Sequence, residues 1–186
     1  FTFLAPVIAE EFGVTGETWS AGTPHQRCLR ITPNCIRVDA DELTYPLHVI
    51  LRYRLEQSLL NGELIVKELP SAWNEIFMNS FGFMPPNDRE GCLQDIHWYD
   101  GAFGYFPTYT LGAMAAAQLF SAALKDNPKI LSNLEKGDFS DLLTWLREHV
   151  HSLGSYYSTD EVIKRATGSP LDPIFYISHL KSRYMQ

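Results

Sequence analysis

The chain has 186 residues, enough for about one domain. It is 45% hydrophobic, 13% aromatic and 20% charged, which suits a folded core and excludes a disordered or low-complexity chain. Its 15 Lys and Arg residues against 22 Asp and Glu give a formal net charge of −7. This acidic balance argues against nucleic-acid binding, because non-specific binding to nucleic acid needs a basic surface.

Apolar residues recur at helical spacing along most of the chain. Residues 41–60 predict an amphipathic helix with Leu43, Leu47, Ile50, Leu51, Leu55 and Leu59 along its apolar side. Between residues 13 and 34, Gly, Thr, Pro and Asn predict a loop or a broken short helix, and residues 91–108 predict an irregular aromatic and Gly-rich loop. Further helices are predicted over residues 1–12, 70–81, 109–126, 139–150, 158–167 and 173–183. We therefore expect a single all-α domain over residues 1–186.

The cellular setting is inferred from cysteine use and from apolar runs. Cys28, Cys35 and Cys92 are odd in number and form no CxxC pair, which favours a reducing, cytoplasmic compartment. The longest apolar stretch, residues 111–124, is too short to cross a bilayer and predicts a buried helix. The chain starts inside a helical pattern without Met or a basic leader, so we expect a piece of a longer protein.

Motifs within the chain do not assemble a complete active site. HExxH, GxSxG, GxxxxGK[ST] and GxGxxG are all absent. His149 and His151 are two residues apart, which on a helix places them roughly 200° apart around the axis. An independent metal hydrolase using His97 with Asp95 or Asp39 is disfavoured, because no second histidine lies at ligand spacing.

The segment from Ile36 to Asp41 has two interpretations. Arg37 and Asp41 are spaced for an i,i+4 ion pair near a helix start, and the residues alone favour this ordinary arrangement. Alternatively, the Arg37 guanidinium faces a cleft and binds a carboxylate through two hydrogen bonds.

Residues 91–109 also have two interpretations. In an extended strand-like stretch Asp95 and His97 point to the same side, so the carboxylate would fix the imidazole tautomer. With Tyr105 and Tyr109 at the start of the next helix, these groups would form an oxyanion-stabilising wall. The alternative, slightly favoured by the residues alone, is an aromatic turn that only fills the core. Its packing residues would be Trp98, Tyr99, Phe103, Tyr105 and Phe106.

Several segments together resemble the carboxypeptidase Taq family of zinc metallocarboxypeptidases. These are IRVDADELTYPLHVILRYRLEQSLLNGEL (36–64), VKELPSAWNE (66–75), PPND (85–88), GCLQDIHW (91–98) and GYFPTY (104–109). The family patterns IRxxAD and GxxQDxHW are present without substitution and in the family's order. The similarity continues weakly through 137–151 and 165–173, and residues 13–30 match least.

The resemblance implies an all-helical fold that forms one wall of a peptidase cleft. The family's zinc ligands, in HExxH and in HES[GQ], would lie before residue 1, so the chain resembles the C-terminal part only. Arg37 would bind the substrate's C-terminal carboxylate, and His97 would donate to the tetrahedral intermediate. Asp95 and Gln94 would position His97 and the substrate.

The resemblance assigns the oxyanion donor to Tyr109 and a second contact to Tyr105, and the sequence does not rank the two phenols. The implied function is the C-terminal substrate-binding portion of a zinc carboxypeptidase of broad specificity, homodimeric when complete. Its substrate would be a peptide with a free C-terminal carboxylate, with no nucleic acid or membrane as partner. We expect this chain alone to bind no zinc and to be inactive. The alternative is a non-catalytic helical interaction module derived from a peptidase half.

Overall fold

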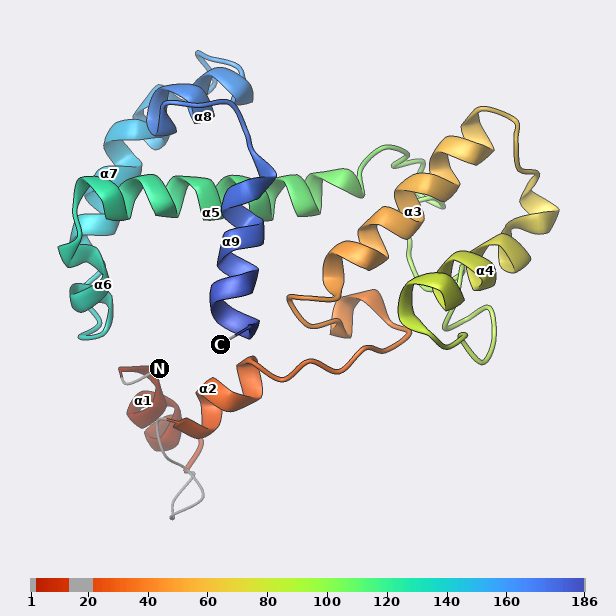
Figure 1. Cartoon of the computed structure of the whole chain (residues 1–186), viewed down its shortest axis with the longest axis horizontal. Coiled ribbons are helices and arrows are strands. Elements are labelled where there is room, and N and C mark those ends of the chain that lie inside the picture. Colours follow the sequence, from red (N-terminus) through yellow and green to blue (C-terminus); the bar gives the residue numbers. More distant parts are fainter. Residues whose placement is uncertain (1–2, 14–21, 186) are drawn as a thin grey trace. The chain divides into compact units, whose positions relative to one another are not determined.

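The computed structural model describes residues 3–13 and 22–185, and within this part of the chain all regular structure is helical (Figure 1). The α-helices are α1 (Leu4–Glu11), α2 (Gly22–Cys28), α3 (Tyr45–Leu60), α4 (Leu69–Phe81), α5 (Pro107–Asp126), α6 (Lys129–Leu134), α7 (Ser140–His149), α8 (Thr159–Thr167) and α9 (Pro173–Tyr184). Three short 3₁₀ turns are η1 (Arg37–Asp39), η2 (Val66–Glu68) and η3 (His151–Leu153). The all-α prediction is confirmed. None of the helices in the described ranges has the length and apolarity needed to span a membrane.

Element boundaries differ from the sequence predictions at a few points. The third helix begins at Tyr45 rather than at residue 41, because Asp41 accepts hydrogen bonds from the backbone amides of Leu43 and Thr44 and forms a turn there. Helix α6 was not predicted. Residues 91–106 are irregular as expected, and α2 is a short helix within the region predicted as loop or broken helix. Of that region, residues 14–21 lie outside the described residues.

The chain divides into two compact units. One contains Arg30–Gly112, and the other contains Phe1–Leu29 together with Ala113–Gln186. The division falls within α5, and each unit has its own core.

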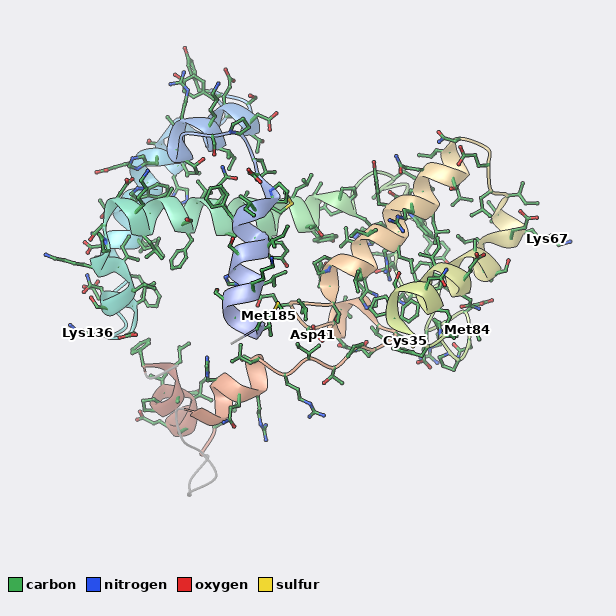
Figure 2. The ribbon with its side chains drawn as sticks, in the orientation of Figure 1. Cys35, Asp41, Lys67, Met84, Lys136 and Met185 are labelled. Atoms are coloured by element: carbon green, nitrogen blue, oxygen red, sulfur yellow. The ribbon has the colours of Figure 1, made fainter. Side chains whose placement is uncertain are left out.

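The core of the unit Arg30–Gly112 lies between α3 and α4, which pack against each other (Figure 1). Its buried members are Leu51, Leu55, Leu69, Trp73, Phe77 and Cys92. Helix α4 can supply three of them because apolar residues recur every fourth position, while Pro70 starts the helix and Gly82, at φ 81°, ends it. Polar side chains such as Lys67 extend away from these helices (Figure 2).

The other unit has a smaller apolar cluster. Ala123, Ile130, Trp145 and Ala166 are its buried members. Helix α8 begins with a capping box, in which Ser158 and Glu161 each accept a hydrogen bond from the other's backbone amide. Gln118, buried on α5, donates to Thr167 and to the Pro170 carbonyl and so ties the turn after α8 to α5.

The buried side of α3 departs from the apolar stripe that the sequence predicted. Ile50, expected to face the core, is 40% exposed. His48, Arg52 and Glu56 are buried instead, at exposures of 0, 0 and 2%. Burying charged side chains is costly unless they are paired or hydrogen-bonded, so their partners define the candidate site.

Candidate active site

The first buried charge on α3, Arg52, holds a carboxylate from the irregular loop. Its Nε lies 2.5 Å from Oδ2 of Asp95, and its Nη1 donates to the His48 carbonyl at 2.9 Å. The guanidinium also lies over the Trp73 ring, with its carbon 4.6 Å from the ring centroid. Cation–π contacts of this kind strengthen when desolvated. Arg52 is therefore held in one orientation, facing Asp95.

The second arginine of the site, Arg37 in η1, uses the other oxygen of the same carboxylate. Its Nε and Nη2 lie 2.9 and 2.8 Å from Asp95 Oδ1, and its Nη1 donates to the Tyr45 hydroxyl at 2.8 Å. The ion pair between Arg37 and Asp41 that the residues alone favoured is wrong. Asp41 instead accepts from backbone amides, including that of Thr32 at 2.8 Å. Local spacing failed here because Arg37 points into the unit rather than along the surface.

Two guanidinium groups thus share one carboxylate in a largely buried setting. The side chains of Arg37 and Asp95 are only 8% and 11% exposed. Burial disfavours the charge on Asp95, but the two arginines outweigh burial and hold the pKa of this carboxyl below its usual range. Burial lowers the pKa of Arg52 to about 10 against the attraction of Asp95. At neutral pH all three groups are charged, so the cluster carries one excess positive charge.

Gln94 connects the two segments that build the site. Its Oε1 accepts from the Arg37 amide at 2.8 Å, and its Nε2 donates to the carbonyls of Cys35 and Glu90 at 2.9 and 2.8 Å. The side-chain amide is thereby occupied by the backbone of this unit. Gln94, predicted as a substrate-binding residue, lies where it holds η1 against the loop.

His97 and Tyr109 form a hydrogen-bonded pair beside the arginines. His97 Nε2 lies 2.9 Å from the Tyr109 hydroxyl, and the Arg37 guanidinium carbon lies 5.2 Å from the Tyr109 ring centroid. Burial raises the pKa of Tyr109, so the phenol keeps its proton at neutral pH. Tyr105 packs edge-on against Tyr109 at 5.4 Å and is 49% exposed.

The predicted hydrogen bond from the His97 imidazole to the Asp95 carboxylate is not made. His97 Nδ1 lies 4.0 Å from Asp95 Oδ1 and has no hydrogen-bond partner, although it is buried. Both carboxylate oxygens of Asp95 accept from arginines, and His97 Nδ1 makes no hydrogen bond to them.

The aromatic residues of the loop divide into two groups. Phe106 is 1% exposed and packs on His97 at 4.3 Å, and the partly buried Trp98 packs against the α3–α4 core. Tyr99, Phe103 and Tyr105 are exposed, so the interpretation that all five are core filler is wrong. At Gly91, where this loop begins, a larger residue would require the backbone nearby to shift slightly, because an added Cβ would stand 3.3 Å from the Asn87 carbonyl oxygen.

Glu56 was not singled out from the sequence, and neither were Tyr45, His48 and Arg52. Glu56 accepts from Trp98 Nε1 at 2.6 Å and from the Gly104 amide at 3.1 Å. A signal was present in the sequence: positions 48, 51, 52, 55, 56 and 59 form an i, i+3, i+4, i+7 stripe. Polar residues inside such a stripe indicate buried polar contacts.

The described residues do not fit a metal. None of their His, Cys, Asp and Glu side chains gather in groups of three or more that could hold an ion. The carboxylate nearest His97 is already bound by Arg37 and Arg52. The arrangement within this unit is instead suited to binding an anion and donating hydrogen bonds beside it.

The unit Arg30–Gly112 thus combines two buried arginines, an imidazole and a phenol on a helical scaffold, and comparisons with known proteins give the family. The carboxypeptidase Taq (M32) metallopeptidase family matches residues 1–184. The chain belongs to this family. Carboxypeptidase 1 of Bacillus subtilis (strain 168) is 46% identical over 152 residues, which are 82% of this chain and 30% of that protein.

Solved structures agree with this assignment. Metallocarboxypeptidase 1 of Trypanosoma cruzi superposes with a TM-score of 0.94 at 42% identity, covering 100% of this chain and 39% of that one. The M32 carboxypeptidase of Deinococcus radiodurans R1 also reaches a TM-score of 0.94, at 36% identity, with 98% of this chain and 37% of that chain covered. The chain spans about a third of the length of the relatives that it matches.

Proposed function

We propose that this chain is the C-terminal substrate-binding portion of a metallocarboxypeptidase that removes C-terminal amino acids from peptides with broad specificity. The proposal rests on family membership and on one observation in particular. Arg37 and Arg52 share the single carboxylate of Asp95, so one positive charge of this three-group cluster has no anion within the cluster. A peptide's terminal carboxylate supplies that anion, and its capture limits cleavage to the chain end.

The neighbouring pair supplies hydrogen bonds to the reacting carbonyl. Tyr109 lies beside Arg37 and is bonded to His97. When the imidazole carries both protons, Nε2 donates to the phenol oxygen, and the phenolic proton is then free to bond an oxyanion. Tyr105, exposed next to Tyr109, is placed for a second contact.

The metal belongs to the complete enzyme in this proposal. We expect zinc there, held by residues outside this chain, and none bound by the 186 residues alone. We also expect the complete enzyme to be a cytoplasmic homodimer. Metal analysis of the purified chain, with an assay for amino-acid release, tests this directly. If the chain alone bound stoichiometric zinc and hydrolysed peptides, the proposal that the zinc ligands lie outside this chain would be wrong.

Arg37→Met tests carboxylate capture in the enzyme that contains this chain. Losing a charged hydrogen-bond donor costs roughly 1.5–3 kcal/mol, so kcat/KM for peptides should fall about tenfold to a hundredfold. The exposed Arg30 provides the control, and Arg30→Met should leave kcat/KM unchanged. Wild-type kinetics in Arg37→Met would show that Arg37 does not bind substrate.

Tyr109→Phe tests the oxyanion donor. Turnover should fall by about 10²-fold with little change in KM, as expected of a group that acts in the transition state. Tyr99→Phe is the matched control, because Tyr99 is 68% exposed on the loop that precedes α5. The same loss in Tyr105→Phe, with no loss in Tyr109→Phe, would move the assignment to the other phenol. If the complete protein that contains this chain hydrolyses no peptide, the chain is better described as an interaction module.

A further inference from the structure

The loop that carries His97 is attached to α3 by two buried charges of opposite sign. Arg52 binds Asp95, two residues before His97. Glu56 lies one helical turn further along α3. It accepts hydrogen bonds from the indole of Trp98, the residue after His97, and from the Gly104 amide near the end of the loop. Among the described hydrogen bonds, the His97 imidazole makes one, to Tyr109. The direction of its imidazole therefore depends on anchors at its neighbours.

We propose that Arg52 and Glu56 are positioning residues that act on two different side chains. Arg52 orients Arg37 through Asp95, and Glu56 orients His97 through Trp98 and Gly104. The inference deepens the proposed function, on which it rests for the roles of Arg37 and His97. The two effects are separate because Arg52 and Glu56 form hydrogen bonds with different residues of the loop. Asp95 uses Oδ2 for Arg52 and Oδ1 for Arg37, so losing Arg52 frees the carboxylate to turn.

Glu56 acts on the other side of the loop. Its two oxygens hold two donors, the Trp98 indole at 2.6 Å and the Gly104 amide at 3.1 Å. A glutamine at this position keeps one acceptor oxygen and replaces the other with an NH₂ group that cannot accept. One of the two anchors is then lost, and the loop between residues 98 and 104 is held at one end.

Stability alone does not account for these charges. Apolar residues of similar volume often replace buried ionic groups without loss of stability. Leu51 and Leu55 on the same side of α3 already provide the apolar packing against α4. The charged groups of Arg52 and Glu56 fix the orientation of the loop against α3, because a hydrogen bond requires a particular angle and apolar packing does not.

Kinetics of two variants in the enzyme that contains this chain test the separation. Arg52→Lys should raise KM about tenfold with kcat within about twofold, because it loosens Arg37. Glu56→Gln should lower kcat about tenfold with KM within about twofold, because it loosens His97. Arg54→Lys and Glu75→Gln change exposed residues of α3 and α4 and should alter neither constant. If both test variants change the same constant, or only the amount of folded enzyme, the proposal is wrong.

A second measurement separates this proposal from the proposed function. In the 186-residue chain labelled with ¹⁵N-histidine, Glu56→Gln should shift the His97 imidazole resonances, and Glu75→Gln should not. An unchanged His97 signal in folded Glu56→Gln overturns the positioning role, whatever the activity. A shifted signal in a protein whose complete form hydrolyses no peptide supports positioning of His97 and rejects the peptidase function.

Discussion

The two units of the chain bury polar groups in different ways. In the unit Arg30–Gly112 the buried polar side chains include four that can carry charge, namely Arg37, His48, Arg52 and Glu56. In the other unit, Gln118 is the buried polar side chain among the described residues. Its amide oxygen accepts from the Asp172 amide at 2.9 Å, and its nitrogen donates to neighbouring carbonyl and hydroxyl groups.

This difference indicates where function lies. A neutral amide that satisfies backbone groups stabilises a turn and needs no further partner. Two guanidiniums that share one carboxylate are satisfied only in part, and Arg52 Nη2 has no hydrogen-bond partner in the described structure. The first arrangement is typical of structural polar groups, and the second of sites where a ligand completes the set of charges.

The largest stability effect should come from Asp95→Asn. Removing one partner from a buried charge pair leaves the remaining charges uncompensated and costs about 3–5 kcal/mol. The matched change in the other unit is Asp126→Asn, where the exposed carboxylate accepts only from the Trp145 indole, and it should cost about 1 kcal/mol. Urea unfolding of both variants measures the difference. If the two variants lost similar free energies of unfolding, the proposed difference between the buried polar groups of the two units would be wrong.

The next effect is a dependence of stability on pH that arises from His48. Burial, followed by the nearby charge of Arg52, lowers the pKa of His48 from 6.5 to about 4. Between these values the unfolded chain takes up a proton that the folded chain does not, so stability is complete above pH 6.5 and falls as the pH drops toward 4. At 1.36 kcal/mol per unit the loss approaches about 3 kcal/mol.

His48→Leu should remove this pH dependence, while the exposed His151→Gln controls for the loss of one histidine. The lowered pKa of Asp95 acts in a separate window. The contribution of Asp95 to the free energy of unfolding is present above its ordinary pKa of 3.8. It is lost as the pH falls through the lower pKa of the folded state. Equilibrium unfolding between pH 7 and pH 4 measures the His48 effect, and an unchanged profile in His48→Leu would contradict it.

The smallest effect should come from Gln118→Leu. The substitution removes several hydrogen bonds between α5 and residues 167–172 and should cost about 1–3 kcal/mol in total. It should not alter the kinetic constants, because the amide serves only the fold of its own unit. Gln57→Leu, on the exposed side of α3, is the control. A change in KM or kcat in Gln118→Leu would extend the functional region beyond residues 30–112.

Local periodicity predicted the helices well, since each depends on residues three and four positions apart. Residues 70–81 were predicted as a helix with Trp73 and Phe77 inward, and both are buried. The contact between Arg37 and Asp95 joins residues 58 positions apart, and no local rule reaches across that distance. The spacing rule selected Asp41 for Arg37 instead.

Family resemblance selected the site residues, and their arrangement came from the fold. It implied Arg37, His97 and Tyr109, which the structure brings into contact. It did not imply that Asp95 binds two arginines, nor that Glu56 anchors the loop, because those roles depend on which face of α3 is buried. Helix α6 was missed because its six residues are too few for periodicity to be recognised.

The spacing of Arg52 and Glu56 has a consequence for how α3 can change. One inserted or deleted residue between them would rotate Glu56 by about 100° around the helix axis while Arg52 stayed in place. The loop would then lose one of its two attachments without any substitution in the loop itself. Tyr53, Arg54 and Gln57, which lie near these two residues on α3, are exposed. Homologues and designed variants should therefore tolerate new side chains on this helix far more readily than a change in its length.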